Sequence, residues 1–303
     1  ENDEARGMAL LEHVYASAPH PWVIGFTGVG GAGKSTLVPR VAEHFADRGE
    51  HIAILAVDPS SPITGGALLG DRVRSMRAQH ERIFFRSLAS RGGTGGLATC
   101  IADVVRLMSA AGRRIVLVET VGAGQSEVAI RDVAHTTVVV SAPGLGDDVQ
   151  AMKAGILEIG AVHAVNKADR PGADEAANTL QQVMALAPGA GHKVEGINEP
   201  DEHHGLRWYP PVVKTSALGG DGLDVLIGRL LEHRRFLERS GEFARRNLAR
   251  DRARMHERLR ALLLERVLAR ARETGVWHSV EHRLQTGETD PMRAAREIFE
   301  ATR

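Results

Sequence analysis

The sequence predicts an α/β protein built on a mostly parallel sheet with helices on both faces. Apolar, β-branched runs recur at 22–27, 51–57, 115–118, 136–140 and 161–165, with weaker candidates at 83–85 and 212–213. Helix-period patterns lie between most of these runs, at 97–111, 147–158 and 173–186. Because the runs are continuously apolar rather than alternating, each strand should be covered on both faces, as parallel strands are.

The first apolar run leads into a glycine-rich loop. It reads Gly28-Val29-Gly30-Gly31-Ala32-Gly33-Lys34-Ser35 and fills the pattern G-x-x-x-x-G-K-[ST] at every fixed position. A strand, this loop and a helical pattern at 36–45 form the context of a phosphate-binding loop, in which backbone amides and a helix N-terminus hold the phosphates. Lys34 would reach the β- and γ-phosphates, and Ser35 would ligate Mg²⁺. The predicted nucleotide contacts here are Gly30, Gly31, Ala32, Gly33, Lys34, Ser35 and Thr36.

Two short segments at the ends of later strands predict which base is bound. The run at 161–165 is followed by Asn166-Lys167-Ala168-Asp169, and the last strand by Ser216-Ala217-Leu218. An ionised Asp169 would accept hydrogen bonds from the ring N–H and the 2-amino group of guanine. Adenine lacks both donors and would leave the carboxylate unpaired. The predicted base contacts are Asn166, Lys167, Asp169, Ser216, Ala217 and Leu218, and the predicted nucleotide is GTP.

The strand at 115–118 predicts part of a metal site. It ends in Glu119-Thr120-Val121-Gly122, where GTPases usually carry Asp-x-x-Gly; Glu119 is still a hard oxygen ligand, and Gly122 would face the γ-phosphate. The candidate catalytic residues are Lys34, Glu119 and Gln125. Gln125 lies two positions later than the water-positioning glutamine of Ras-like proteins, so a polar loop residue near a subunit surface is an equal interpretation.

The second strand and the loop after it add two acidic candidates. Asp58 emerges from a strand beside the phosphates and is a candidate Mg²⁺ ligand. Asp71 would approach the metal only if the loop at 59–70 folds over it, and its alternative role is the N-cap of a helix at 72–80. Further along, residues 143–155 include Asp147, Asp148 and Lys153. From the residues alone, that segment is an N-capped helix with a solvated lysine.

Composition excludes several classes of function. Lysine plus arginine and aspartate plus glutamate both total 38, which predicts no nucleic-acid and no membrane partner. The single cysteine, Cys100, excludes an internal disulfide and any Cys-x-x-Cys site. No apolar run is long enough for a membrane span, and residues 1–21 contain no signal-peptide apolar core. We therefore expect a soluble, cytoplasmic protein.

The C-terminal region has a different composition. Residues 241–274 contain ten arginines against five acidic residues, with apolar positions spaced for one long amphipathic helix. A shorter helix at 291–301 would begin with Asp290 as N-cap and Pro291 as first helical residue. The predicted domains are an N-terminal helical extension (1–21), a nucleotide-binding domain (22–240) and a helical arm (241–303). The arm either folds back on its own domain or embraces a second copy.

These segments together resemble one family. The phosphate loop at 28–35, the D-P-S-S-P to L-G-D block at 58–71, the E-T-V-G-x-G-Q-S segment at 119–126 and the N-K-A-D segment at 166–169 are similar to those of the MeaB/ArgK (MMAA-like) P-loop GTPases, a branch of metal and cofactor chaperones. The resemblance spans about residues 22–235.

The resemblance implies a function and a partner. It implies a homodimeric GTPase that chaperones adenosylcobalamin-dependent methylmalonyl-CoA mutase, gating cofactor loading and protecting the mutase. It implies that Ser35, Asp58, Asp71 and Glu119 hold Mg²⁺, and that residues 143–155 are a switch in which Lys153 links nucleotide state to the mutase. Intrinsic hydrolysis should be slow, because no internal arginine finger is visible.

Two alternatives stay open. A nickel-insertion GTPase of the same branch would need a Cys/His cluster, for which His203-His204 is the only paired donor site. An ATP-dependent kinase linked to amino-acid transport would prefer ATP, whereas Asp169 favours guanine.

Overall fold

The structure is a computed structural model, and the described part of the chain divides into two units. The described residues are 4–59, 80–90, 96–120, 126–144, 154–186 and 207–302. The first unit is Glu1–Asn247 and the second is Leu248–Arg303. Among the helices of the described residues, none is both long and apolar enough to cross a bilayer.

The first unit is built on a sheet whose seven described strands are all parallel, in the order β3-β2-β4-β1-β5-β6-β7. The strands are β1 (Trp22–Gly28), β2 (Ile52–Pro59), β3 (Ile83–Ser90), β4 (Ile115–Thr120), β5 (Thr136–Ser141), β6 (Val162–Val165) and β7 (Val212–Lys214). All seven coincide with apolar runs of the sequence, including the two weaker ones. The α/β fold class with a parallel sheet is therefore confirmed.

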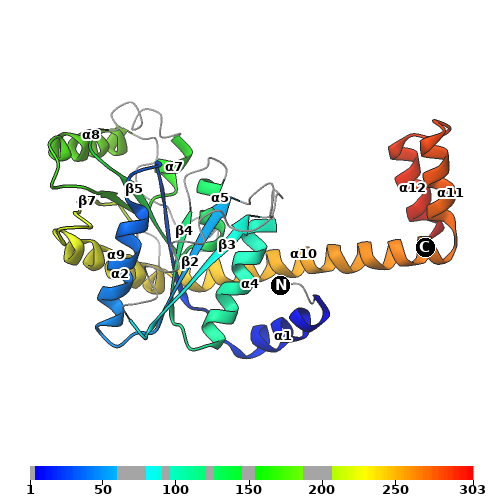
Figure 1. Cartoon of the computed structure of the whole chain (residues 1–303), viewed down its shortest axis with the longest axis horizontal. Helices are drawn as coiled ribbons and strands as arrows, with labels where there is room; N and C mark the ends of the chain where they lie inside the picture. The colour runs from blue at the N-terminus through cyan, green and yellow to red at the C-terminus, as the bar shows by residue number, and fades with distance from the viewer. Residues whose placement is uncertain are drawn as a thin grey trace, which may run out of the picture. The chain divides into compact units, whose positions relative to one another are not determined.

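Helices cover both faces of this sheet (Figure 1). They are α1 (Glu4–Ser17), α2 (Lys34–Ala46), α4 (Gly96–Ala110), α5 (Ser126–Val133), α7 (Ala154–Glu158), α8 (Ala173–Leu186) and α9 (Leu223–Arg239). Helices α2 and α9 pack on one face, whereas α4 and α5 pack on the other. The sequence predicted helices in the regions of α2, α4 and α8 but did not identify α5 or α9 separately. The predicted helix at 147–158 is described only from Ala154 onward.

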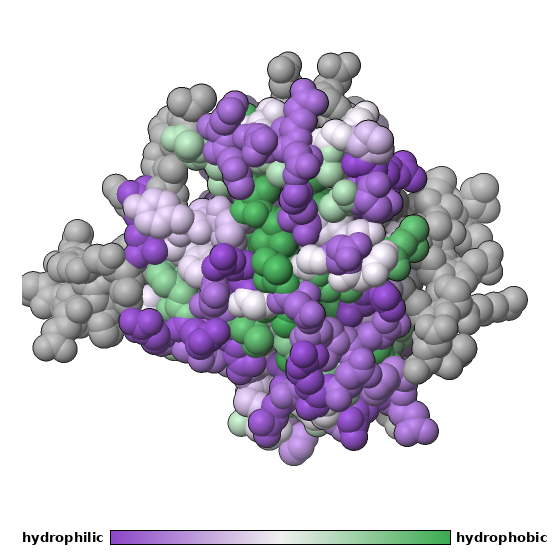
Figure 2. All heavy atoms as spheres, turned by 90° about the vertical axis from the view of Figure 1, so that its left-hand side faces the viewer, coloured by the Kyte–Doolittle hydropathy of each residue, from purple (hydrophilic) through white to green (hydrophobic). Residues whose placement is uncertain are grey.

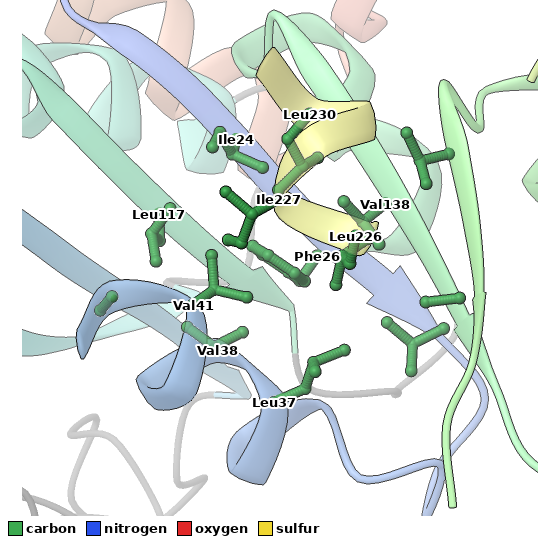
Figure 3. Packing of buried hydrophobic residues seen from close by; sticks show 14 of the residues in the cluster. Ile24, Phe26, Leu37, Val38, Val41, Leu117, Val138, Leu226, Ile227 and Leu230 are labelled. Atoms are coloured by element: carbon green, nitrogen blue, oxygen red, sulfur yellow. The ribbon is translucent and has the colours of Figure 1, made fainter. Parts of the chain in front are cut away.

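Phe26 lies at the centre of the larger core, between α2 and α9 (Figure 3). Its neighbours include Leu37 and Val41 of α2 and Leu226 and Leu230 of α9, and all five side chains are fully buried. Burying one such side chain contributes about 1.5–3 kcal/mol to stability. This packing fixes the helix that follows the glycine loop against the strand that precedes it.

The N-terminal helix α1 is attached to the first unit through α4. The Tyr15 hydroxyl donates to Asp103 at 3.0 Å, and the Arg106 guanidinium lies 4.9 Å from the Tyr15 ring centroid. Arg106 also donates to the carbonyl of Tyr15, and Ser109 donates to the carbonyl of Pro19. These polar contacts place the N-terminal extension on the α4 side of the sheet.

The β7 side of the sheet is short and partly charged. β7 has three residues, and Lys214 at its end forms an ion pair with Asp174 of α8. In Figure 2 this side faces the viewer, and a narrow hydrophobic strip is bordered by hydrophilic side chains. A short edge strand with a charged residue offers little backbone for pairing with another chain.

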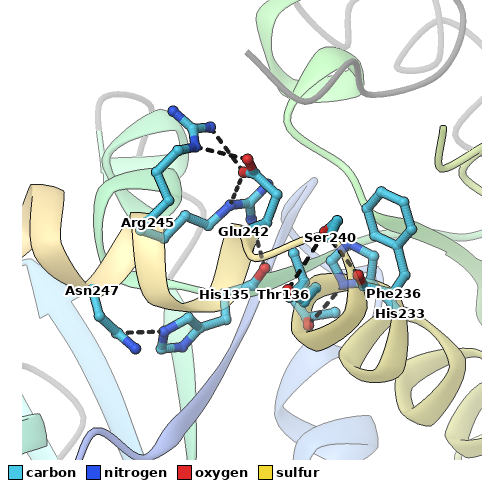
Figure 4. Close-up of polar contacts among 10 residues, drawn as sticks. His135, Thr136, His233, Phe236, Ser240, Glu242, Arg245 and Asn247 are labelled. Atoms are coloured by element: carbon cyan, nitrogen blue, oxygen red, sulfur yellow. Dashed lines mark hydrogen bonds and ion pairs between the residues drawn. The ribbon is translucent and has the colours of Figure 1, made fainter. Parts of the chain in front are cut away.

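His135 connects three elements at the amino ends of the central strands (Figure 4). Its Nδ1 accepts from the Val23 amide at 3.0 Å, so its Nε2 carries the proton and donates to Asn247 Oδ1 at 2.7 Å. The ring stacks on Phe243 at 4.3 Å, and Arg246 donates to the His135 carbonyl at 2.7 Å. Hydrogen bonds of His135 therefore join β1, the start of β5 and the start of α10 (Glu242–Glu273).

A second cluster of buried hydrogen bonds lies beside His135, around Thr136. Thr136 Oγ1 accepts from Trp22 Nε1 at 3.0 Å and lies 2.9 Å from His233 Nδ1. Glu242, whose side chain is only 4% exposed, pairs with Arg245 and Arg246. The Thr136 contacts join β1, β5 and α9, whereas the Glu242 ion pairs lie within the first turns of α10.

The second unit contains the rest of α10, followed by α11 (Val276–Gln285) and α12 (Pro291–Ala301). The single long helix and the helix at 291–301 were predicted, but α11 was not. The predicted N-cap of α12 is confirmed, because the Asp290 side chain accepts from the amides of Met292 and Arg293.

Replacing His135 by phenylalanine should destabilise the protein. The ring would still stack on Phe243, but the Val23 amide and the Asn247 side chain would each lose a buried partner. We expect a loss of about 2–4 kcal/mol in the free energy of unfolding, measured with denaturant. His13→Phe, at an exposed histidine of α1, is the matched control and should cost almost nothing. Equal effects of the two substitutions would contradict the role assigned to His135.

Candidate functional site

The glycine loop lies at the carboxyl end of β1, where ligands of parallel sheets bind. At Gly28, φ is +128°, and a Cβ atom there would lie 2.1 Å from the carbonyl oxygen of Val140 in β5. At Gly33, φ is +90°, and a Cβ atom would lie 2.5 Å from Asn166 Nδ2. Both positions therefore require glycine, because any side chain would push the loop away from β5 and β6.

The loop ends at the N-terminus of α2. Gly33 is the N-cap residue and makes no side-chain capping bond, and the first turn of α2 contains no acidic residue. A helix N-terminus presents backbone N–H groups and a positive dipole end to an anion. Ser35 is half-buried and Thr36 is exposed in this first turn. The loop and helix are therefore arranged to receive phosphate.

Lys34 lies beneath the loop. Its side chain is 6% exposed, and its Nζ donates to the carbonyls of Gly28 at 2.6 Å and Val29 at 2.9 Å. The two carbonyl acceptors hold the ammonium group at a fixed position. Its charge therefore lies at the loop that would enclose a phosphate.

Asn166 connects this loop to the two segments predicted to read the base. Its Nδ2 donates to the carbonyl of Ala32 at 2.9 Å, whereas its Oδ1 accepts from the Ala217 amide at 3.1 Å. The Thr215 hydroxyl donates to the same Oδ1 at 3.4 Å. Asn166 is 2% exposed, so these bonds are shielded from water. Three loops that are distant in sequence thus meet at one amide side chain.

Lys167 makes a parallel connection. Its Nζ donates to the carbonyl of Gly31 at 2.7 Å. Among the described residues it is the one non-glycine residue with a positive φ, at 59°. Such a conformation is normally unfavourable for a lysine and often marks a functional site. The lysine side chain therefore reaches the glycine loop.

Asp169 and Ser216 form a hydrogen-bonded pair next to these loops. Ser216 Oγ donates to Asp169 Oδ1 at 2.7 Å and itself accepts from the Gly219 amide at 3.1 Å. The hydrogen bond from Ser216, followed by one from its own backbone amide, lowers the pKa of Asp169 below the usual carboxyl value. The carboxylate is exposed and stays ionised at neutral pH. It is a hydrogen-bond acceptor held in a fixed orientation.

The remaining base contacts differ in burial. Ala217 is buried, at 4% exposure, whereas Leu218 is 83% exposed. The sequence interpretation missed Thr215, which is fully buried and bonded to Asn166. Its position directly before Ser216 was the available signal.

Glu119 is the described carboxylate among the predicted metal ligands. It is 2% exposed and lies opposite Phe26 at the end of the β1–β4 ladder. Leu117, two residues earlier, packs in the core formed by α2 and α9, so the strand alternation places Glu119 on the α2 face. The described residues contain no group of three or more His, Cys, Asp or Glu that could hold a metal.

Several predicted site residues lie outside the described residues. These are Asp71, Gly122, Gln125, Asp147, Asp148 and Lys153. The backbone of Asp58 is described at the end of β2, but its side chain is not. Their predicted roles stay predictions.

Comparisons with known proteins identify the family of this chain. A family model described as methylmalonyl-CoA mutase-associated GTPase MeaB matches residues 1–274. A protein of Pyrococcus abyssi is 38% identical over 296 residues, which cover 97% of this chain and 87% of that protein. A fused isobutyryl-CoA mutase of Geobacillus kaustophilus is 37% identical over 186 residues, which cover 60% of this chain and 17% of the mutase.

One solved structure shows the same fold. A crystal structure of an LAO/AO transport system kinase superposes with a TM-score of 0.65, covering 99% of this chain and 88% of that one at 21% identity. The family model is stronger evidence than this structural likeness, because it matches the amino-acid sequence over residues 1–274. The chain belongs to the MeaB family of methylmalonyl-CoA mutase-associated GTPases.

Proposed function

We propose that this protein binds and hydrolyses GTP with Mg²⁺ and serves as a cytoplasmic chaperone of an adenosylcobalamin-dependent methylmalonyl-CoA mutase. In this role it would gate loading of the mutase cofactor and protect the mutase. The observation that carries the nucleotide part is the Asp169 carboxylate, oriented by Ser216 and linked through Asn166 to the glycine loop.

Base selection follows from the chemistry of that carboxylate. An ionised carboxylate accepts from two parallel donors, which guanine provides through its ring N–H and its 2-amino group. Adenine offers neither donor at that edge, and an unpaired, desolvated carboxylate costs binding free energy. The same argument disfavours an ATP-dependent kinase.

The phosphates and the metal would be held by different parts of the site. The amides of the glycine loop and the N-terminus of α2 would bind the β-phosphate, with Lys34 at the β- and γ-phosphates. Ser35, Asp58, Asp71 and Glu119 are hard oxygen donors of the kind that Mg²⁺ takes. Bound there, Mg²⁺ would neutralise charge that develops on the phosphate oxygens during hydrolysis. Gly122 and Gln125 would complete the γ-phosphate side.

The partner is inferred from the family and from a fused relative. The family is named for its association with methylmalonyl-CoA mutase, and a related sequence occurs within a fused isobutyryl-CoA mutase. By analogy with that fused protein, we infer that this chain acts on a separate mutase subunit. Asp147, Asp148 and Lys153 are the proposed switch toward that subunit.

A homodimer is the proposed assembly, formed through the C-terminal arm. Exposed apolar side chains follow α10, at 49% exposure for Leu248, 56% for Met255, 49% for Leu259 and 45% for Leu262. At 100° per residue these four lie within about 60° of one another around the helix. A stripe of this kind is typical of a helix–helix interface.

Asp169→Asn is the direct test of guanine recognition. Asparagine would present an N–H donor to the guanine 2-amino group, so GTP affinity should fall by about a hundredfold or more. Xanthosine triphosphate, whose 2-oxygen accepts that donor, should bind the variant better than GTP does. Titration calorimetry with GTP, ATP and xanthosine triphosphate measures this. A wild-type preference for ATP, or unchanged GTP affinity in the variant, would refute the assignment.

Lys153→Ala tests the proposed coupling to the mutase. GTP affinity should stay unchanged, because Lys153 is placed in the partner switch rather than in the nucleotide contacts. Stimulation of GTP hydrolysis by purified methylmalonyl-CoA mutase should be largely lost. If the mutase stimulates the variant fully, Lys153 is not part of the switch. If the mutase does not stimulate the wild-type protein, methylmalonyl-CoA mutase is not the partner.

Leu259→Glu tests the dimer. A charge in the middle of the apolar stripe should convert the dimer to monomer in light scattering. Leu264→Glu is the matched control, because Leu264 is also exposed, at 59% against 49% for Leu259, but lies about 140° around the helix from Leu259. A monomeric wild-type protein, or a dimer that tolerates both substitutions, would be the contrary result.

A further inference from the structure

The backbone ladder between β1 and β4 ends just before the glycine loop. Its last pair is Phe26 with Glu119. Beyond it, Thr27 and Gly28 pair only with β5, whereas Thr120 pairs with Val57 of β2. Beyond Phe26 and Glu119, β1 and β4 are therefore no longer paired through their backbones.

Two buried hydroxyl groups continue the connection past the last backbone pair. Thr120 Oγ1 lies 3.3 Å from the carbonyl oxygen of Phe26, to which it donates, and 3.2 Å from Thr27 Oγ1. Thr27 is 0% exposed and Thr120 is 2% exposed. These side chains thus hold β4 to β1 where the backbone no longer does.

The two threonines lie on the opposite face of the sheet from Glu119. Val116 and Val118 precede Thr120 on its face of β4, and both pack in the core formed by α4 and α5. Glu119 lies on the α2 face, on the side of Lys34. The hydroxyl pair therefore contacts the end of β4 on the α4 and α5 face of the sheet. It leaves the α2 face, where Glu119 lies, unobstructed.

At its carboxyl end, β1 contacts β5 on its other side through the backbone of Gly28. Gly28 approaches β5 so closely that a Cβ atom would lie 2.1 Å from the Val140 carbonyl oxygen. The position of the loop relative to β5 is therefore set by backbone contact, and its position relative to β4 by the threonine pair. Valine has nearly the same shape as threonine but cannot make this link.

We propose that Thr27 and Thr120 are positioning residues for GTP hydrolysis, which fix the separation between the glycine loop with Lys34 and the Glu119 end of β4. This inference rests on the proposed function. A small displacement between groups on two sides of a reacting phosphate lowers the rate more than it lowers binding of the base.

Thr120→Val in the full chain is the primary test. We expect kcat for GTP to fall by about ten- to a hundredfold, and the Mg²⁺ concentration for half-maximal activity to rise. GDP affinity measured without Mg²⁺ should stay close to that of the wild type, because the Asn166, Asp169 and Ser216 contacts are untouched. Thr120→Ser, which keeps the hydroxyl, should restore most of the activity.

A double-mutant cycle tests whether the two hydroxyls act together. Thr27→Val should lower kcat less than Thr120→Val does, because Thr120 can still donate to Phe26. The double variant should be no slower than Thr120→Val alone, since coupled residues are not additive. Thr136→Val is the matched control: it also removes a buried, doubly bonded hydroxyl, but at the amino end of β5, and should lower thermal stability without lowering kcat.

The outcomes are distinguishable. An absence of GTP hydrolysis by the wild-type protein would overturn the proposed function and this inference with it. A wild type that hydrolyses GTP beside an unchanged Thr120→Val variant would overturn the inference alone. Additive losses in the double variant, or an equal loss of kcat in Thr136→Val, would also overturn it, because either result describes general loosening of the sheet.

Discussion

The side chain of Asn166 is the contact on which the geometry of the candidate site depends. It bridges the carbonyl of Ala32 and the amide of Ala217, two groups that lie more than a hundred and thirty and about fifty residues from it in sequence. Because the amide is buried, losing either partner would leave a polar group unsatisfied at a cost of about 1–3 kcal/mol. The phosphate end and the base end of a nucleotide would therefore be held at one fixed separation.

The two ends of the sheet carry different kinds of interactions. At the carboxyl ends, glycines at positions 28 and 33 allow backbones to approach so closely that side chains can reach across loops. At the amino ends, His135 and Thr136 join the starts of β1 and β5 to α9 and α10 through buried hydrogen bonds.

Much of the fold could be predicted because its signals are local. Continuous apolar runs identify buried parallel strands, and even the weak candidates at 83–85 and 212–213 became strands. The helices α9 and α11 were missed. Each follows a glycine with positive φ, but so does α2, which was predicted, so the missing polar N-cap does not by itself explain the two omissions. His135 gave no signal either, because its partners Val23 and Asn247 lie about 112 residues away on either side.

The amino-acid sequence by itself determined the chemical groups of this protein: the glycine loop, the lysine, the carboxylate predicted to favour guanine and the apolar runs of the sheet. Backbone propensity and side-chain chemistry act over a few residues, so they can be recognised without coordinates. Only the tertiary structure decided that Ser216 orients Asp169, that Asn166 joins three loops, and that Thr120 meets Thr27. Those relations depend on strand order and register, which arise from packing between segments that are distant in the chain.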